Sequence, residues 1–247
     1  MKRLFDVAAA AVGLLACSPV LVPLTVLIWW QDGRSPFYLA PRVGKDGRAF
    51  RMVKLRTMVV DADATGVDST SVDDARITPL GRHVRRFKLD ELPQLVNVLR
   101  GDMSLVGPRP NVRRETDLYT ALERRLLSVR PGVTDFASIV FADLGEILVA
   151  RADPDIAYNQ LVRPGKSALG LFYVENHSFL ADLRLCWLTA VAIVDRPRAL
   201  AGVARLLRRL GAPPELVRVA SRAEPLVATS PPGADRIVTE RRGDPAR

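Results

Sequence analysis

The chain has 247 residues, of which 48% are hydrophobic and 26% are charged, a composition that indicates a globular protein rather than a disordered one. Its core is large enough to fold without disulfides, and Cys17 and Cys186 lie in apolar stretches that indicate buried thiols in a reducing compartment. The net charge of +9 points to nucleic acid, anionic lipid or phosphorylated ligands as partners. Aromatic residues are only 6%, which argues against a platform for single-stranded nucleic acid.

Residues 7–30 form an apolar run of 24 residues without a charge. As one straight helix the run would be about 36 Å long, enough to cross a bilayer. It ends on Trp29 and Trp30, and tryptophan favours the membrane interface. The run has three interpretations: a spanning helix, a signal peptide, or a helix that enters and leaves the membrane on one side. The signal peptide is the weakest, because the run continues for thirteen residues after Cys17.

Two features favour the re-entrant helix over a spanning one. Pro19 removes a backbone donor near the middle of the run and predicts a helix break, and the Ser18 hydroxyl can bond to a carbonyl that is freed. Basic residues also flank both ends of the run. They are Lys2 and Arg3 before it, and Arg34, Arg42, Lys45, Arg48 and Arg51 after it. Because basic flanks stay cytoplasmic, both ends are expected on the cytoplasmic side.

A β-hairpin is predicted after the apolar run. Residues 37–39 form a strand candidate, and residues 50–55 return as the second strand. Between them, Asp46 and Gly47 give a strong turn signal. The basic side chains of this hairpin are expected near the membrane surface, where they could contact lipid headgroups or a phosphate ligand.

Residues 61–75 contain five aspartates and no basic residue, which predicts a surface loop. Residues 59–65 also fit the pattern of phosphatases that form an aspartyl phosphate. That fold needs a regular alternation of strands and helices, which the sequence does not show. A phosphatase of this type is therefore a weak alternative.

The two adjacent carboxylates Asp90 and Glu91 stand in the most basic part of the chain. Nine basic residues accompany only three acidic ones between Arg76 and Arg114, which predicts a site for a phosphorylated substrate. The alternative is a solvated helix face with ordinary ion pairs. Pro93 suits the first turn of a helix, so the carboxylates are expected at or just before a helix N-terminus.

An apolar face follows the two carboxylates at helical spacing. Its members are Leu92, Leu95, Val96 and Leu99. Gly101 ends this predicted helix, and residues 102–110 read as an irregular turn. Pro108 and Pro110 make the turn rigid around Arg109, whose guanidinium suits a phosphate clamp.

The C-terminal half gives fewer signals of chemistry. Residues 111–130 predict one charged amphipathic helix, and residues 180–194 an apolar helix, either at the membrane surface or in the core. Residues 196–210 predict a basic helix that could rest on anionic lipid. Residues 211–247 contain six prolines and few large apolar side chains, which predicts a disordered tail.

Seven motifs occur together in the chain. They are residues 2–6 (KRLFD), 18–19 (SP), 42–47 (RVGKDG), 54–58 (KLRTM), 89–95 (LDELPQL), 101–110 (GDMSLVGPRP) and 130–132 (RPG). In these motifs and their order the chain resembles the short form of the monotopic phosphoglycosyl transferases. This bacterial sugar transferase family starts the assembly of polyprenyl-phosphate-linked glycans. The resemblance covers about residues 1–195.

The resemblance implies an α+β, mainly helical fold on the cytoplasmic face of the bacterial inner membrane. Residues 1–31 are expected to form the re-entrant membrane helix hairpin. Residues 32–195 would form a small cytoplasmic catalytic domain with a β-hairpin and interfacial amphipathic helices. Residues 196–247, the basic helix and the tail, have no counterpart in the resemblance.

The resemblance also implies a reaction. Asp90 would attack the sugar-linked phosphate of a UDP-sugar, releasing UMP, and polyprenyl phosphate would then take the phosphosugar from Asp90. Glu91 would be associated with Mg²⁺. The expected phosphate-binding residues are Lys54, Arg56, Arg85 and Arg109. The expected partners are the UDP-sugar, polyprenyl phosphate and membrane lipid, with no nucleic acid, and a homo-oligomer stays open.

Two departures from the family pattern concern the site. Asp135 stands where the family usually has glycine, which puts the choice of sugar in doubt, and Lys88 stands where serine is common. A function of a different class is a membrane-tethered basic binding or scaffold protein without catalysis. Substitution of Asp90 separates the two, because only the enzyme needs that carboxylate.

Overall fold

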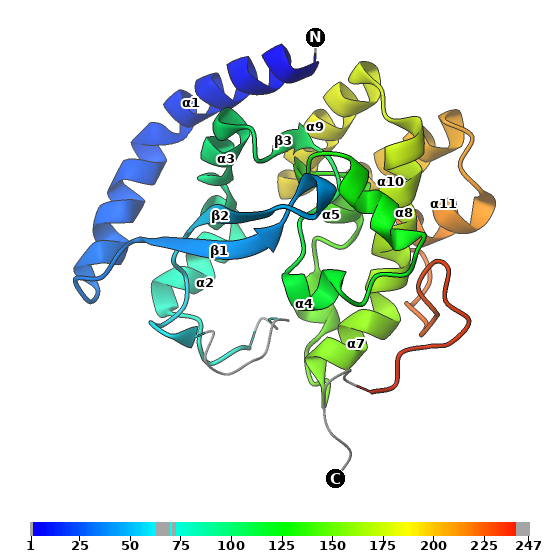
Figure 1. Ribbon diagram of the computed structural model, residues 1–247. Helices are drawn as coiled ribbons and strands as arrows, with labels where there is room; N and C mark the ends of the chain where they lie inside the picture. Colours follow the sequence, from blue (N-terminus) through cyan, green and yellow to red (C-terminus); the bar gives the residue numbers. More distant parts are fainter. Residues whose placement is uncertain (1, 63–69, 71–72, 241–247) are drawn as a thin grey trace. The chain divides into compact units, whose positions relative to one another are not determined.

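The computed structural model describes residues 2–62, 70 and 73–240 (Figure 1). These residues divide into two compact units. The first is formed by the described residues of Met1–Ala62, Ala75–Leu118 and Leu127–Asp135. The second is formed by those of Asp63–Asp74, Tyr119–Leu126 and Phe136–Arg247. Most of the loop predicted at residues 61–75, including part of the aspartate pattern at 59–65, lies outside the described residues.

The predicted hairpin is present in the first unit. Strands β1 (Phe37–Val43) and β2 (Ala49–Leu55) pair in antiparallel register over their whole length. The short 3-10 turn η1 (Lys45–Gly47) connects them. Asp46 and Gly47 have φ values of 56° and 76°, a left-handed region that glycine and aspartate tolerate better than most residues. The turn chemistry that predicted the hairpin is therefore confirmed.

The rest of the first unit is mainly helical. Its elements are α2 (Pro79–Arg86), η3 (Leu89–Glu91), α3 (Gln94–Arg100), β3 (Ser104–Val106), α4 (Arg113–Thr116) and β4 (Gly132–Thr134). The prediction of a wholly irregular turn at residues 102–110 was wrong, because β3 pairs in parallel with β4. The two backbones approach so closely that a Cβ on Gly132 would lie 2.1 Å from the Gly107 nitrogen.

Helix α1 (Lys2–Trp30) is continuous, although Pro19 and Pro23 lie inside it. The predicted helix break at Ser18 and Pro19 is therefore corrected to a helix that continues through both residues. Ser18 Oγ donates a 2.8 Å hydrogen bond to the Leu15 carbonyl, which has lost its usual donor because residue 19 is proline. The helix also curves along its length (Figure 1).

By length and composition, α1 could cross a membrane, and it is the only such helix among the described residues. Most of its apolar side chains are exposed, but a few anchor it to the first unit. Asp6 accepts hydrogen bonds from Ser104 Oγ at 2.8 Å and from the Leu105 nitrogen at 3.3 Å. Arg3 donates to two carbonyls in the last turn of α3.

The single helix predicted at residues 111–130 is not present. Two short elements, α4 and the 3-10 helix η4 (Glu123–Ser128), replace it. Thr120 and Glu123 explain the interruption, since each side chain accepts a 3.1 Å hydrogen bond from the other residue's backbone nitrogen. This reciprocal pair is a capping box, which starts a new helical turn and ends the previous one.

The second unit is all helical apart from its connections. Its elements are the beginning of η4, α5 (Phe136–Val140), α6 (Leu144–Ile147), α7 (Pro154–Leu161), α8 (Arg163–Asn176), α9 (Phe179–Val194), α10 (Arg196–Arg209) and α11 (Pro214–Ser221). Phe136 packs edge to face on Phe172 and Tyr173, with centroid distances of 6.2 and 6.5 Å. Helix α9 confirms the helix predicted at 180–194 and leaves Trp187 and Val194 69% and 90% exposed.

The region after residue 195 is more ordered than predicted. The basic helix is confirmed as α10, but residues 214–221 form a further helix where a disordered tail was expected. Leu216, Val217 and Ala220 are buried on one face of α11. Their helical spacing gives this short segment an apolar face that the high proline content of the region conceals.

Candidate active site

Asp90 and Glu91 lie in η3, the turn that directly precedes α3. Pro93 is the N-cap residue of α3 and has helical torsion angles, so the predicted position of the two carboxylates is confirmed. Lys88, just before η3, has a φ of 56°, which reverses the chain between α2 and η3. Asp90 is only 6% exposed, so its carboxylate is not part of an ordinary solvated surface.

Strand β2 brings a lysine to both carboxylates. Lys54 Nζ lies 3.6 Å from Asp90 Oδ2 and 3.6 Å from Glu91 Oε1. The Lys54 side chain is only 18% exposed. Both distances exceed the usual length of a hydrogen bond, so the ammonium stabilises the carboxylates mainly through its charge.

Arg109 binds Glu91 in a fork. Its Nη1 donates to Glu91 Oε2 at 3.0 Å, and its Nη2 donates to Oε1 at a shorter distance. The loop that presents Arg109 follows β3, as the two flanking prolines predicted. Two parallel bonds between guanidinium and carboxylate fix both groups in one plane. Glu91 is therefore held firmly, whereas within the described part of the chain the Asp90 carboxylate makes only the longer contact with Lys54.

The charges of the site shift the pKa values of its members. Burial would raise the pKa of Glu91, but Arg109 and Lys54 outweigh it and hold this pKa well below its usual range. Burial lowers the pKa of Lys54 below its ordinary value of 10.5, with Glu91 acting in the opposite direction. Burial would also lower the pKa of Arg109, but the Glu91 carboxylate raises it. Glu91 is therefore ionised at neutral pH.

The other two predicted phosphate ligands have different surroundings. Arg56 donates to both oxygens of Asp32, at 2.5 and 2.6 Å, and to the Ser35 carbonyl. This ion pair lowers the pKa of Asp32 to about 2. Arg85 Nη1 lies 3.4 Å from Thr57 Oγ1. Among the described residues, no contact joins Arg56 or Arg85 to the two carboxylates.

Comparison with known proteins decides the family. The family model of the bacterial sugar transferases matches residues 1–196. The chain belongs to the bacterial sugar transferase family. The match includes Lys54, Asp90, Glu91 and Arg109, and it ends at the first residue of α10.

Several curated proteins are similar to this sugar transferase. The uncharacterized sugar transferase EpsL of Bacillus subtilis (strain 168) is 37% identical over 76% of this chain and 85% of its own length. The exopolysaccharide production protein ExoY of Rhizobium meliloti (strain 1021) is 35% identical over 78% of this chain and 84% of its own. The undecaprenyl-phosphate glucose phosphotransferase of Komagataeibacter xylinus is 39% identical over 76% of this chain and 35% of its own.

Two buried amides in α3 of the sugar transferase were missed in the sequence. Asn97 accepts a 2.8 Å hydrogen bond from the Val53 nitrogen and donates one of 2.8 Å to the Arg51 carbonyl. It therefore fixes α3 against β2, which carries Lys54. Gln94 is fully buried, and neither of its side-chain polar atoms has a hydrogen-bond partner among the described residues. Both amides lie off the predicted apolar face of Leu92, Leu95, Val96 and Leu99, so the helical pattern gave no signal for either.

Asp90 and Glu91 do not form a complete metal site by themselves. No group of three or more His, Cys, Asp or Glu side chains in the described part of the chain could hold a metal alone. Magnesium is nevertheless usually held by one or two carboxylates together with substrate phosphates. Asp90 and Glu91 supply such a pair of oxygen ligands. They fit an ion that arrives with a phosphorylated substrate and competes with Arg109 for Glu91.

Proposed function

We propose that this sugar transferase moves a sugar 1-phosphate from a UDP-sugar to polyprenyl phosphate and releases UMP. The product, a polyprenyl-diphosphate-linked sugar, would start the assembly of a lipid-linked glycan. Several relatives are named as transferases that act on undecaprenyl phosphate, among them the undecaprenyl-phosphate glucose phosphotransferase, and they support this choice of acceptor. The single observation that carries the proposal is that two adjacent carboxylates, Asp90 and Glu91, make different contacts. Glu91 is clamped by Arg109, while Asp90 is buried but not clamped.

In the first step, Asp90 acts as the nucleophile. A carboxylate oxygen of Asp90 attacks the phosphorus that carries the sugar, and a new O–P bond forms. The P–O bond to the uridine monophosphate breaks, and UMP leaves with the bonding electron pair. The phosphosugar stays on Asp90 as an acyl phosphate. Asp90 suits this role because its longer contact with Lys54 leaves its oxygens available for attack.

In the second step, the lipid acceptor takes the phosphosugar. A phosphate oxygen of polyprenyl phosphate attacks the same phosphorus, and the bond between phosphorus and Asp90 breaks. The electron pair returns to Asp90, which becomes a free carboxylate again. The two steps are the same exchange at phosphorus with different partners, so one set of charges can serve both.

The basic side chains supply the electrostatic stabilisation that both steps need. Lys54 lies close enough to the two carboxylates to attract a diphosphate to the same place. Arg109 holds Glu91 in one orientation and can share its donors with a phosphate oxygen. A Mg²⁺ ion held by Glu91 and the substrate phosphates would withdraw negative charge from the leaving UMP.

We also propose that α1 enters and leaves the membrane on its cytoplasmic side. Basic residues at both ends of its apolar run and the curvature of the continuous helix (Figure 1) support this topology. The Ser18 hydrogen bond allows the helix to tolerate Pro19 inside an apolar medium. Such an anchor would keep the site at the depth of the lipid phosphate, which the second step requires.

The test is a panel of UDP-sugars, each supplied with undecaprenyl phosphate and Mg²⁺, with UMP release as the readout. At least one sugar should give UMP, and Asp90→Asn should abolish the release. Asp117→Asn is the matched control, because it removes an exposed carboxylate of the same unit outside the proposed site. Full activity in Asp90→Asn would refute the nucleophile. Absence of UMP with every sugar would favour the binding or scaffold protein instead.

A further inference from the structure

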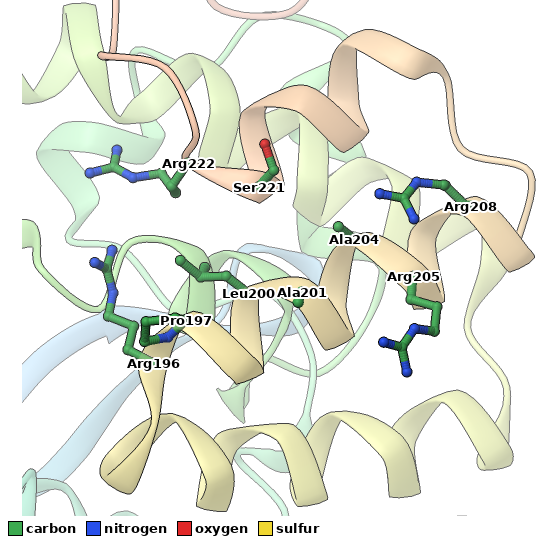
Figure 2. Close-up of a pocket in the computed structure, with 9 residues that line it drawn as sticks. All are labelled: Arg196, Pro197, Leu200, Ala201, Ala204, Arg205, Arg208, Ser221 and Arg222. Atoms are coloured by element: carbon green, nitrogen blue, oxygen red, sulfur yellow. The ribbon is translucent and has the colours of Figure 1, made fainter.

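A second basic site lies in the second unit, far along the sequence from the two carboxylates. Helices α10 and α11 enclose a pocket of about 520 Å³, a size in the usual range for small-molecule sites (Figure 2). Its lining residues are Arg196, Pro197, Leu200, Ala201, Ala204, Arg205, Arg208, Ser221 and Arg222. All of them except Arg196 lie beyond the stretch that the family model matches. The family therefore assigns this pocket no role.

The pocket is strongly positive. Four of its lining residues are arginines, and none of the described residues that line it is acidic. Figure 2 shows Arg196 and Arg222 at one end and Arg205 and Arg208 at the other. The two ends are about 18 Å apart along α10, given its rise per residue, so one small anion cannot contact all four. The end formed by Arg196 and Arg222 is the more ordered one, because their side chains are partly buried and both pair with an acidic residue.

One carboxylate orients both of these guanidinium groups. Asp143 lies behind them, and its two oxygens are 2.8 Å from Arg196 Nη2 and 2.8 Å from Arg222 Nη2. The Arg222 guanidinium also packs over the Phe141 ring, 5.6 Å from the centroid. Because one negative charge serves two positive ones, this end of the pocket keeps a net positive charge and a fixed geometry.

The hydrogen bonding of this cluster is incomplete. Among the described residues, Arg196 Nε, Arg222 Nη1 and Asp143 Oδ1 are buried without a hydrogen-bond partner, so Asp143 pairs with Arg196 through charge alone. Buried charged donors are normally paired, and an unpaired one needs an explanation. Arg222 has a φ of 52° because it is the left-handed C-cap residue that ends α11. A phosphate oxygen is the acceptor that best matches two guanidinium groups at one point.

We propose that Arg196 and Arg222 bind a phosphate group in the α10–α11 pocket. The phosphate belongs either to a lipid headgroup or to a free phosphorylated molecule. Its oxygens accept hydrogen bonds from the partly exposed guanidinium groups of Arg196 and Arg222, while Asp143 pairs with both groups. Arg205 and Arg208 extend the positive potential along α10. The site does not depend on the transferase chemistry at Asp90.

The experiment uses the full chain in a non-ionic detergent and two probes. Inorganic pyrophosphate represents the free phosphate, and dihexanoyl-phosphatidylglycerol represents the headgroup, with dihexanoyl-phosphatidylcholine as the zwitterionic reference. Calorimetry gives the affinity of each probe. The chain offers a matched control for each pocket arginine. Arg222→Gln is compared with Arg218→Gln on the same helix, and Arg196→Gln is compared with Arg198→Gln.

Each pocket substitution should weaken binding about tenfold, because it removes one charge-assisted hydrogen bond. The control substitutions, which remove an exposed arginine, should change affinity less than about twofold. If the pocket substitutions weaken the binding of pyrophosphate, the site binds a free phosphate. If they weaken only the binding of phosphatidylglycerol, the site binds a lipid headgroup. Either result supports the proposal. Equal effects of pocket and control substitutions, or no binding of either probe, would overturn it.

The folded state of each variant is checked by thermal unfolding. Each single substitution leaves Asp143 with one arginine partner, so the variants should fold. If Arg222→Gln fails to fold, Arg222→Lys keeps the positive charge but cannot donate from two nitrogens in one plane. It should still weaken binding several-fold. Arg222→Lys with unchanged affinity, together with Arg196→Gln with unchanged affinity, would refute the site.

Discussion

Single residues determine how the two adjacent carboxylates differ. Glu91 shares both oxygens with Arg109, and Asp90 does not. At this scale the sequence predicted well where a residue's role follows from its charge and its motif, as for Lys54 and Arg109. It predicted poorly where the role depends on a distant partner. Arg56 is bound to Asp32, and Asn97 bonds to the backbone of β2, because the fold brings together positions that are far apart in sequence.

The Arg109 fork makes a prediction about turnover. Arg109→Ala should lower turnover about 100-fold or more, because it removes a pre-oriented cation from a site that handles phosphate charge. Arg109→Lys should recover only part of this loss, since it restores the charge but not the fork. Steady-state UMP release checks both. Arg100→Ala, which removes an exposed cation from α3, is the control and should stay near the unchanged enzyme.

The same substitution should change the pH profile. With Arg109 present, the pKa of Glu91 lies well below its usual range, so Glu91 stays ionised at mildly acidic pH. In Arg109→Ala the effect of burial is less well opposed, so the pKa of Glu91 rises. The acidic limb of the UMP-release profile should then move to higher pH. An acidic limb at the same pH in both proteins would contradict the stated cause.

The ion pair of Asp32 and Arg56 can be tested by titration. The Asp32 carboxyl has a pKa of about 2 in the folded chain, below the ordinary 3.8. The contribution of the pair to stability is therefore complete above 3.8 and is lost as the pH falls through about 2. Carbon NMR of the Asp32 carboxyl should show this value and a return toward 3.8 in Arg56→Gln. Arg48→Gln removes an exposed charge from the same hairpin and should leave it unchanged.

Helices and strands were predictable where their chemistry is local. The hairpin followed from Asp46 and Gly47, and α10 from its own apolar and basic spacing. The parallel pair β3–β4 could not be predicted, because each strand has three residues and its partner lies elsewhere in the chain. The break expected at Pro19 did not occur, since the neighbouring Ser18 hydroxyl supplies the missing donor.

The topology proposed for α1 can be tested on the element itself. Tags at the two ends of the chain should both be accessible from the cytoplasmic side, because basic residues flank each end of the apolar run. Protease protection of inverted and right-side-out vesicles gives the readout. A tag at one end that is reached only from outside would instead support a spanning helix. Pro19→Ala combined with Pro23→Ala should favour that spanning form, because both causes of curvature are removed.

At the scale of the molecule, the part of the chain after residue 195 belongs to the second unit and is not an appendage. Leu207 in α10 is fully buried, and Leu216 in α11 is 8% exposed. Deleting residues 196–247 should therefore lower the free energy of unfolding of that unit by more than about 5 kcal/mol, enough to unfold it. Thermal unfolding measures the effect. An unchanged melting temperature would mean that α10 and α11 contribute nothing to the fold.

A point substitution gives a milder form of the same test. Leu207→Ala should cost about 2–5 kcal/mol, the usual range for a leucine that leaves a cavity. Val227→Ala is the control, since Val227 is 70% exposed, and it should stay within about 0.5 kcal/mol of the unchanged protein. The sequence could not predict this result, because the prolines of the last forty or so residues are typical of disordered segments.

The central claim is that Asp90 carries the phosphosugar. The full chain is incubated with the UDP-sugar that gives UMP, but without a lipid acceptor, and its intact mass and peptides are measured. The protein should gain the mass of one sugar phosphate on the peptide that contains Asp90. Undecaprenyl phosphate should discharge it, and Asp90→Asn should never acquire it. An adduct that persists in Asp90→Asn, or UMP release only when both substrates are present and no adduct forms, would contradict the account.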